Sequence, residues 1–212
     1  MTLGTDLDLT ALGSWLEGAL PGFKGPLKAE KFNRGQSNPT FRLSAASGDY
    51  VLRRKPPGVL LKSAHAVERE FRVQKALAGS DVPVARMHVL CEDDSVIGSA
   101  FYVMDLVRGR NFDEPRLPDL DPQTRRGIYD ELNRVLAAIH GIDLEARELA
   151  DYGPGGNYYR RQIDRWTKQY RASETGPIPA MDELIAWLDA NVPEDDGRRT
   201  LVHGDYRIDN LL

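Results

Sequence analysis

The chain has 212 residues, of which 41% are hydrophobic and 28% are charged, an ordinary composition for a folded globular protein. Its 28 lysine and arginine residues against 32 aspartate and glutamate residues leave a formal net charge of −4. Because no broad basic face is available to meet the phosphates of DNA or RNA, a nucleic-acid partner is not expected.

Residues 40–54 contain two short runs rich in aromatic and β-branched side chains, separated by a turn cluster at Ser47-Gly48-Asp49. This pattern predicts a β-hairpin. Pro56 and Pro57 end the second strand, because proline has no amide hydrogen for the ladder. A further strand is expected before Arg34.

An amphipathic segment over residues 64–78 predicts a helix whose apolar side chains share one stripe. Two more strands are expected at residues 85–90 and 99–106, joined by an acidic turn. Residues 1–107 are therefore predicted to form strand, strand, helix, strand and strand, and the additional strand before Arg34 precedes these five elements.

After Gly109 the apolar spacing becomes helical. Asp121 followed by Pro122 combines an N-cap with a first-turn proline, and predicts a long helix that ends near His140. Two shorter helices are expected further on, and residues 200–212 are expected to form a strand and a loop. The apolar positions of the shorter helices are Ile163, Trp166 and Tyr170 in one, and Met181, Leu184, Ile185 and Leu188 in the other.

Membrane insertion and secretion are not expected. The longest uncharged stretch near the middle, residues 95–104, is too short to cross a bilayer, and no cationic start precedes an apolar run. A single cysteine, Cys91, excludes an internal disulfide and leaves too few thiols for a cysteine-built zinc site. A reducing cytoplasm is the expected location.

The strongest chemical signal is the segment His203-Gly204-Asp205-Tyr206-Arg207-Ile208-Asp209-Asn210. Asp205 and Asn210 have the spacing of a protein-kinase catalytic loop, in which the aspartate accepts the proton of the substrate hydroxyl and the asparagine holds a magnesium ion. A short loop that returns on itself brings both groups to the transferred phosphate. An ordinary Asp-Asn turn beside a buried histidine is the alternative interpretation.

This segment resembles the catalytic loop of the aminoglycoside phosphotransferase-like superfamily, small-molecule kinases with a protein-kinase-like fold. RGQSNPTFRL, YVLRRKPPG and FYVMDLVRG resemble the family's first hairpin, third strand and hinge, and GGNYYRRQIDRWTKQY resembles a subgroup associated with acyl-CoA dehydrogenase-like domains. The resemblance runs from about Lys31 to Leu212. It implies an α+β, two-lobe fold, with a nucleotide-binding lobe at residues 1–107 made of an antiparallel sheet and one helix, and a mainly helical, partial lobe at residues 108–212.

The resemblance further implies a basic residue on the third strand that contacts the phosphates of ATP and is held by a glutamate of the next helix. The basic position is Arg53, where the family pattern has lysine, and Lys55 on the same face of the strand is the fallback. We choose Glu70 as the partner, because it lies on the buried stripe of the helix while Glu68 lies on the polar side. A surface ion pair is the alternative.

Two further segments are implied to bind the nucleotide. Gln36, Ser37 and Asn38 lie where the family has its nucleotide-covering loop, although a plain turn before a strand explains them as well. In the hinge, Asp105 would offer its carbonyl and Val107 its amide to adenine, with Met104 against the ring. A core strand that runs into a loop is the alternative there.

ATP and Mg²⁺ are thus the expected cofactors, with Asp205 catalytic and Asn210 on the metal. The resemblance also implies a second metal-binding aspartate roughly 10 to 20 residues after Asn210, whereas the sequence given ends at Leu212. We therefore expect either part of a longer kinase or a non-catalytic, pseudokinase-like nucleotide-binding module.

The expected partner is a small molecule with a hydroxyl group. The subgroup resemblance favours a hydroxylated metabolite, such as a hydroxyacyl thioester, over an antibiotic. Arg160, Arg161 and Arg165 would suit an anionic substrate, although we favour a solvated helix face as the explanation for them.

Overall fold

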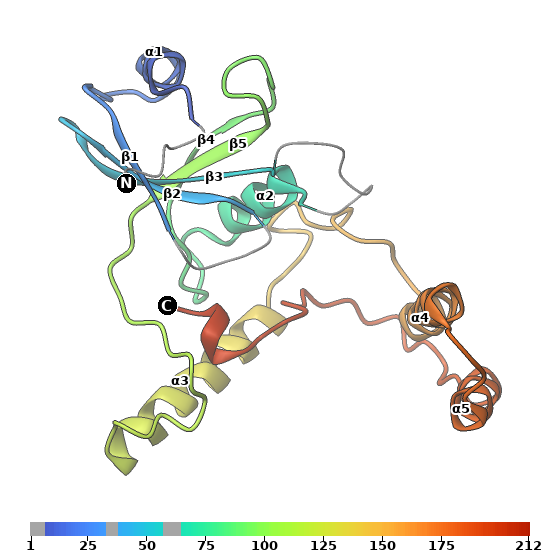
Figure 1. Ribbon diagram of the computed structural model, residues 1–212. Coiled ribbons are helices and arrows are strands. Elements are labelled where there is room, and N and C mark those ends of the chain that lie inside the picture. Colours follow the sequence, from blue (N-terminus) through green and yellow to red (C-terminus); the bar gives the residue numbers. More distant parts are fainter. Residues whose placement is uncertain (1–6, 33–37, 57–64) are drawn as a thin grey trace. The chain divides into compact units, whose positions relative to one another are not determined.

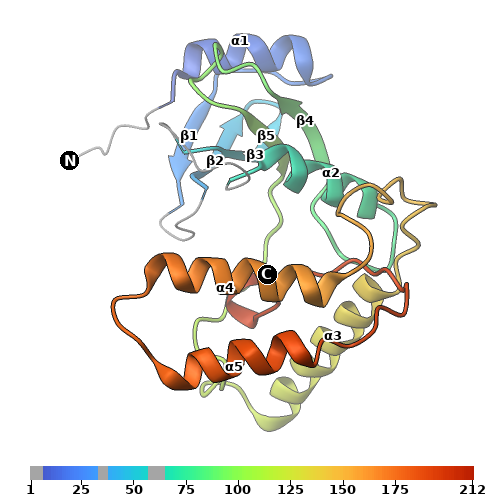
Figure 2. The same ribbon diagram turned by 90° about the vertical axis from the view of Figure 1, so that its right-hand side faces the viewer.

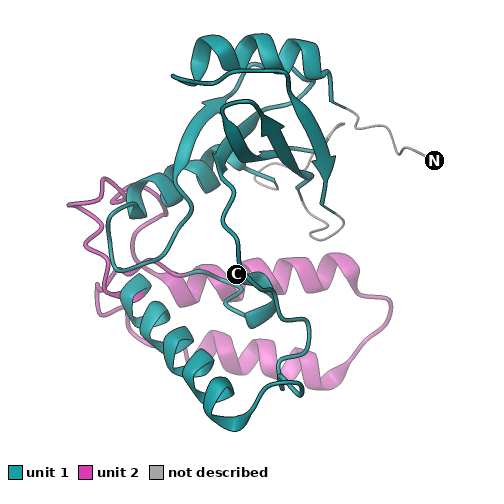
Figure 3. Cartoon of the chain, turned by 90° about the vertical axis from the view of Figure 1, so that its left-hand side faces the viewer, with its two compact units in different colours: residues 1–139, 203–212 teal, residues 140–202 magenta. Residues whose placement is uncertain are grey.

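The computed structural model describes residues 7–32, 38–56 and 65–212 (Figure 1). It divides into two compact units, one formed by residues 1–139 with 203–212 and one formed by residues 140–202 (Figure 3). The segment with Asp205 and Asn210 thus belongs to the same unit as the sheet. The lobe boundary at residues 107 and 108 differs from this division and stays a prediction.

A five-stranded antiparallel sheet forms the centre of the first unit, with strand order β1-β2-β3-β5-β4. The predicted hairpin and the strand before it are confirmed, and so are the two later strands. The strands are β1 (Lys28–Lys31), β2 (Thr40–Ala45), β3 (Gly48–Arg54), β4 (Met87–Cys91) and β5 (Phe101–Asp105).

The structure contains a helix before the sheet, α1 (Leu9–Ala19), that was not predicted from the sequence. The carboxylate of Asp8 accepts hydrogen bonds from the amides of Thr10 and Ala11 at 3.0 and 2.9 Å, which caps the helix. Leu12 and Leu16, one turn apart, are fully buried. The helix forms because a capping residue precedes apolar positions at helical spacing.

Removal of this cap tests how strongly α1 stabilises the sheet. We expect Asp8→Ala to lower the free energy of unfolding by about 1 kcal/mol, because two helix amides lose their acceptor. Urea unfolding monitored by circular dichroism measures the loss. Asp8→Asn, which retains a capping oxygen, is the matched control, and equal losses in the two variants would contradict the capping role.

The two faces of the sheet are covered by different helices, because successive side chains of a strand point to opposite sides. On one face α1 packs against an apolar cluster that includes Phe41, Leu52 and Phe101. On the other, the predicted helix α2 (Val67–Leu77) packs against a smaller cluster around Tyr102 (Figures 1 and 2). Polar side chains on the α2 face are therefore held between a helix and the sheet.

The long helix predicted after Asp121 is confirmed as α3 (Pro122–His140). Its N-cap is Asp121, whose carboxylate accepts hydrogen bonds from the amides of Gln123 and Thr124 at 2.9 and 3.0 Å. Farther along the helix, the carbonyl of Leu132 accepts a 2.8 Å hydrogen bond from the Tyr206 hydroxyl. This contact ties the C-terminal segment to α3.

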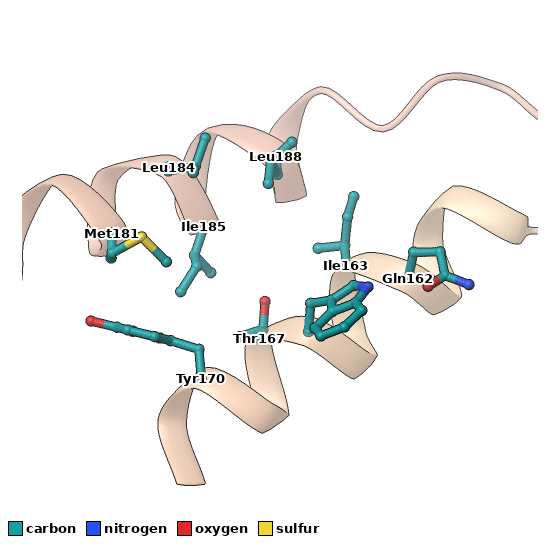
Figure 4. A pocket seen from close by; sticks show the side chains of 9 residues that line it. Gln162, Ile163, Thr167, Tyr170, Met181, Leu184, Ile185 and Leu188 are labelled. Carbon is teal, nitrogen blue, oxygen red and sulfur yellow. The ribbon is translucent and has the colours of Figure 1, made fainter. Parts of the chain in front are cut away.

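The second unit contains the two shorter predicted helices, α4 (Tyr158–Ser173) and α5 (Pro179–Ala190). They lie side by side, and Ile163, Tyr170 and Ile185 are among the side chains that line a cavity of about 250 Å³ between them (Figure 4). Along the described residues, no helix is long and apolar enough to span a membrane.

The prediction of a strand at the start of residues 200–212 is wrong. This segment runs as an irregular chain into a short 3₁₀ helix, η1 (Ile208–Asn210). A strand needs a neighbour that completes its backbone hydrogen bonds, and within the described part of the chain the sheet pairs β1 to β5 only with one another. The periodicity of a short apolar run does not reveal whether such a neighbour exists.

Candidate functional site

The predicted ion pair between Arg53 and Glu70 forms on the α2 face of the sheet. In the register of the sheet, Arg53 of β3 lies between Thr40 of β2 and Tyr102 of β5. The Nε of Arg53 donates to Oε2 of Glu70 at 2.8 Å, and its Nη1 donates to the Thr40 hydroxyl at 3.2 Å. The ion pair that the family resemblance implied is therefore present, and Glu70 rather than Glu68 is the partner of Arg53.

The carboxylate of Glu70 collects donors from three separate segments. Its Oε2 accepts hydrogen bonds from Arg53 and from the hydroxyl of Tyr102, the latter at 3.0 Å. Its Oε1 accepts a 2.8 Å hydrogen bond from Nδ2 of Asn38. The position of Glu70 is therefore set by the sheet and by the residue that precedes β2, as well as by its own helix.

Tyr102 is almost completely buried, with 1% of its surface exposed. Burial, together with the nearby carboxylate of Glu70, raises the pKa of its phenol well above the ordinary value of 10. The hydroxyl therefore stays protonated and serves as a donor to Glu70.

We expect Tyr102→Phe to lower the free energy of unfolding by about 1 kcal/mol near pH 8, because one hydrogen bond to Glu70 is lost. Above about pH 10 the unfolded tyrosine loses its proton while the folded one keeps it, so the wild type loses stability with rising pH. The variant has no such phenol at this position. Urea titrations at pH 8 and pH 10.5 measure the two values, and a difference that grows with pH would contradict this account.

Three residues were expected to cover the nucleotide. The structure describes Asn38, while Gln36 and Ser37 lie outside the described residues. Asn38 is 2% exposed. Its Nδ2 donates to Glu70, and its Oδ1 forms a 2.8 Å hydrogen bond with Nδ1 of His65. The side chain is therefore engaged inside the protein, which leaves the backbone as the part of Asn38 able to contact a nucleotide.

The fallback basic residue, Lys55, has a different partner. Its Nζ lies 2.8 Å from Oε2 of Glu68, the carboxylate on the polar side of α2. The two basic residues of β3 and its extension thus use different carboxylates. Arg53 is the one that pairs with Glu70, the carboxylate that also accepts from the buried side chains of Asn38 and Tyr102.

The expected hinge residues lie at the end of β5 and directly after it. Met104 packs against the apolar cluster on the α2 face. The carboxylate of Asp105 lies 2.6 Å from Nε2 of His88, a neighbour on β4, and the amide of Asp105 donates to the carbonyl of Arg86. Val107 follows the strand and is 48% exposed. Its exposure is compatible with an adenine contact, and that role stays a prediction.

In the predicted catalytic loop, the side chains of Asp205 and Asn210 are in direct contact. Nδ2 of Asn210 donates to Oδ2 of Asp205 at 2.7 Å and to its backbone carbonyl at 3.1 Å. Oδ1 of Asp205 faces Nε of Arg207 at 3.1 Å, and Arg207 also pairs with Asp209. The η1 turn creates this contact, because it brings residue 210 back toward residue 205.

Two contacts anchor the loop at its ends. Tyr206 donates to α3 and stacks edge-on against the ring of His203, with ring centroids 5.4 Å apart. Beyond Asn210, the carbonyl of Leu211 accepts a 2.8 Å hydrogen bond from Nδ2 of Asn111. The carboxylate of Asp205 itself remains largely exposed, with 63% of the side chain accessible. It is open to a substrate from solvent.

The donor set of these residues fits a nucleotide and its magnesium ion. Nη2 of Arg53 makes no hydrogen bond to any described residue, and a guanidinium amino group is a suitable donor for phosphate oxygens. When Nδ2 of Asn210 faces Asp205, its Oδ1 is directed elsewhere and is a hard oxygen ligand of the kind that Mg²⁺ prefers. Magnesium in nucleotide sites needs few protein ligands, because phosphates and water supply the rest.

Two features of this site were not predicted from the sequence. Tyr102 was expected only as part of a strand, and the side chain of Asn38 was expected to contact the nucleotide rather than Glu70. Alternation along β5 indicates that Tyr102 shares a face with Met104, but the hydroxyl contact to Glu70 depends on packing between strand and helix.

The arginines considered for an anionic substrate are largely engaged within the second unit. Arg160 pairs with Asp189 of α5, and Arg161 donates to the carbonyls of Pro154 and Gly155. The guanidinium of Arg165 lies over the ring of Trp166. These contacts favour a structural role for the three side chains.

Comparison with known proteins finds relatives that match nearly the whole of this chain. The chain is 50% identical over 203 residues to acyl-CoA dehydrogenase family member 10 of Mus musculus, and 43% identical over 209 residues to family member 11 of Homo sapiens. These matches cover 95% and 97% of this chain, but 19% and 27% of the two relatives. The chain thus spans about a fifth to a quarter of these relatives' length.

Solved structures show the same fold. A Ralstonia eutropha protein assigned to the aminoglycoside phosphotransferases is 53% identical, with a TM-score of 0.85 over 97% of this chain and 60% of that protein. A macrolide 2′-phosphotransferase from Brachybacterium faecium is 22% identical, with a TM-score of 0.57 over 93% of this chain and 65% of that protein, and it supports the fold alone. The family model described as the phosphotransferase enzyme family matches residues 28–212. The resemblance seen in the sequence is confirmed, and the chain belongs to the phosphotransferase enzyme family.

Proposed function

We propose that this chain carries the catalytic loop and phosphate-contacting residues of a kinase that transfers the γ-phosphate of ATP to a hydroxyl group of a small molecule. The observation that carries the proposal is the direct contact between Asp205 and Asn210 in the loop. Family membership supports phosphoryl transfer as the reaction class.

Each residue has a role that follows from its chemistry. Asp205, exposed and acceptor-only when ionised, holds the acceptor hydroxyl and takes its proton as the oxygen attacks the phosphorus. Asn210 fixes the orientation of Asp205 and presents Oδ1 to the metal. Arg53, held by Glu70, directs Nη2 to the phosphates. Mg²⁺, when bound, neutralises charge on the phosphate oxygens.

The class of acceptor is proposed from the relatives. Proteins named as acyl-CoA dehydrogenase family members match nearly the whole chain at 41% to 50% identity. A hydroxylated acyl metabolite, such as a hydroxyacyl thioester, is therefore the acceptor class that we favour over an antibiotic.

The test is calorimetric titration of the natural full-length protein with ATP, with and without Mg²⁺, followed by assay of ADP formation with hydroxyacyl thioesters. The proposal expects magnesium-dependent ATP binding and ADP formation that requires an acceptor. ATP binding that does not depend on Mg²⁺, with no ADP formed with any hydroxyl compound, would instead support a non-catalytic nucleotide-binding module.

A further inference from the structure

A buried amide lies next to the ion pair that is proposed to meet the phosphates. Asn38 is 2% exposed, and both ends of its side chain are engaged. Its Nδ2 donates to Oε1 of Glu70 at 2.8 Å. Its Oδ1 has no hydrogen, so the 2.8 Å contact with His65 requires a hydrogen on Nδ1 of the imidazole. The amide is thus locked in one orientation by two partners.

The orientation of Asn38 determines the orientation of the Glu70 carboxylate. Asn38 occupies Oε1, while Arg53 and Tyr102 both donate to Oε2. With its two oxygens held by different segments, the carboxylate receives only one hydrogen bond from Arg53, through Nε. The remaining contact of the guanidinium among described residues is Nη1 to Thr40, which leaves Nη2 available.

Loss of the donor on Oε1 would change this arrangement. A carboxylate free to rotate next to an arginine favours the bidentate geometry, in which two guanidinium nitrogens face its two oxygens. Nη2 of Arg53 would then turn to Oε1 of Glu70 and would no longer be available to a phosphate. The hydrogen bond from Nδ2 of Asn38 to Oε1 of Glu70 opposes this bidentate contact, because it already occupies that oxygen.

We propose that Asn38 is a positioning residue for nucleotide binding. Its amide occupies one oxygen of Glu70 and thereby keeps Nη2 of Arg53 available for the phosphates of ATP. The proposal rests on the proposed kinase function, and it assigns to the side chain of Asn38 a role different from direct contact with the nucleotide.

Asn38→Asp tests the proposal, because it keeps the shape and the oxygen that faces His65 but replaces the donor that faces Glu70. In the natural full-length protein with Mg²⁺, we expect calorimetry to show ATP affinity reduced at least about tenfold. Adenosine affinity should change less than about twofold, because adenosine has no phosphate for Arg53 to contact. Leu43→Ala, on the opposite α1 face, is the control for lost stability and should leave the ratio of the two affinities unchanged.

A reciprocal pair of substitutions provides a second test that does not need the single Asn38→Asp variant to fold. In Asn38→Asp/Glu70→Gln, the new amide at position 70 can donate to the new carboxylate at position 38. The double variant should bind ATP at least about threefold more tightly than Glu70→Gln alone, because the hydrogen bond and the negative charge beside Arg53 are restored.

The outcomes separate the two proposals. Equal losses of ATP and adenosine affinity in Asn38→Asp, or no loss of either, would overturn the positioning role, and so would a double variant no better than Glu70→Gln. If the wild type itself binds no ATP, the proposed function fails before the role of Asn38 is reached.

Discussion

Asp205→Asn is expected to lower the rate of phosphoryl transfer by about 10³-fold, while ATP affinity stays within about twofold of the wild type. Asparagine has the same shape, and its Oδ1 can still accept the hydrogen bond that Asn210 donates. The contact with Asn210 is therefore kept, the contact with Arg207 is lost, and the proton acceptor for the substrate hydroxyl is removed. Initial rates of acceptor-dependent ADP formation, with ATP affinity from calorimetry, measure the two effects.

Asp209→Asn is the matched control for this prediction. Asp209 lies in the same loop, and its carboxylate pairs with Nη2 of Arg207 at 3.1 Å. We expect its rate to stay within about threefold of the wild type. An equal loss of activity in both variants would mean that charge in the loop, rather than the carboxylate of Asp205, is what the reaction requires.

Glu70→Ala is expected to affect stability and nucleotide binding together. The buried amide of Asn38 and the buried hydroxyl of Tyr102 both lose their acceptor, which should lower the free energy of unfolding by about 2–4 kcal/mol. Arg53 also loses the partner that holds it, so ATP affinity should fall about tenfold or more. Urea unfolding and calorimetry measure the two quantities.

Glu68→Ala separates this effect from the general loss of a helix carboxylate. Glu68 lies two residues away on the same helix, is exposed to a similar degree, with 36% of its side chain accessible against 32% for Glu70, and pairs with Lys55 at 2.8 Å. Pairs of this kind contribute little, so we expect less than about 1 kcal/mol of lost stability and no change in ATP affinity. If Glu68→Ala matched Glu70→Ala in both measurements, the network around Glu70 would not have the importance given to it here.

Much of the sheet and the pairing of its charges could be predicted from local patterns. The turn cluster at Ser47-Gly48-Asp49 placed the hairpin, and the position of Glu70 on the apolar stripe of α2 selected it over Glu68 as the partner of Arg53. The hairpin rests on a local turn signal, and the choice between the two glutamates rests on periodicity, which fixes the face on which a side chain lies. That a helix glutamate pairs with Arg53 at all was implied by the family resemblance. Where the face decides the contact, the sequence is sufficient.

Other features depend on packing between distant segments, which periodicity does not describe. Helix α1 was missed although its cap at Asp8 and the spacing of Leu12 and Leu16 were visible signals. The contacts of Asn38 with Glu70 and His65 bring together residues 32 and 27 positions apart. No local pattern gives the orientation of a buried amide.

The C-terminal segment illustrates a third limit. Residues around Leu201 have strand-like composition, yet they form no strand in the described part of the chain, because β-structure depends on a neighbouring strand. The contact between Asp205 and Asn210 is a local feature, because a turn of five residues brings the two side chains together. The catalytic and metal-binding roles assigned to them from their spacing stay predictions.

The most direct test of the central claim is to follow phosphorus by ³¹P NMR while the natural full-length protein acts on Mg²⁺-ATP and a hydroxyacyl thioester. The account predicts one phosphomonoester formed for each ADP by the wild type, and none above background by Asp205→Asn. Release of inorganic phosphate without a phosphomonoester, at the same rate in both proteins, would contradict it.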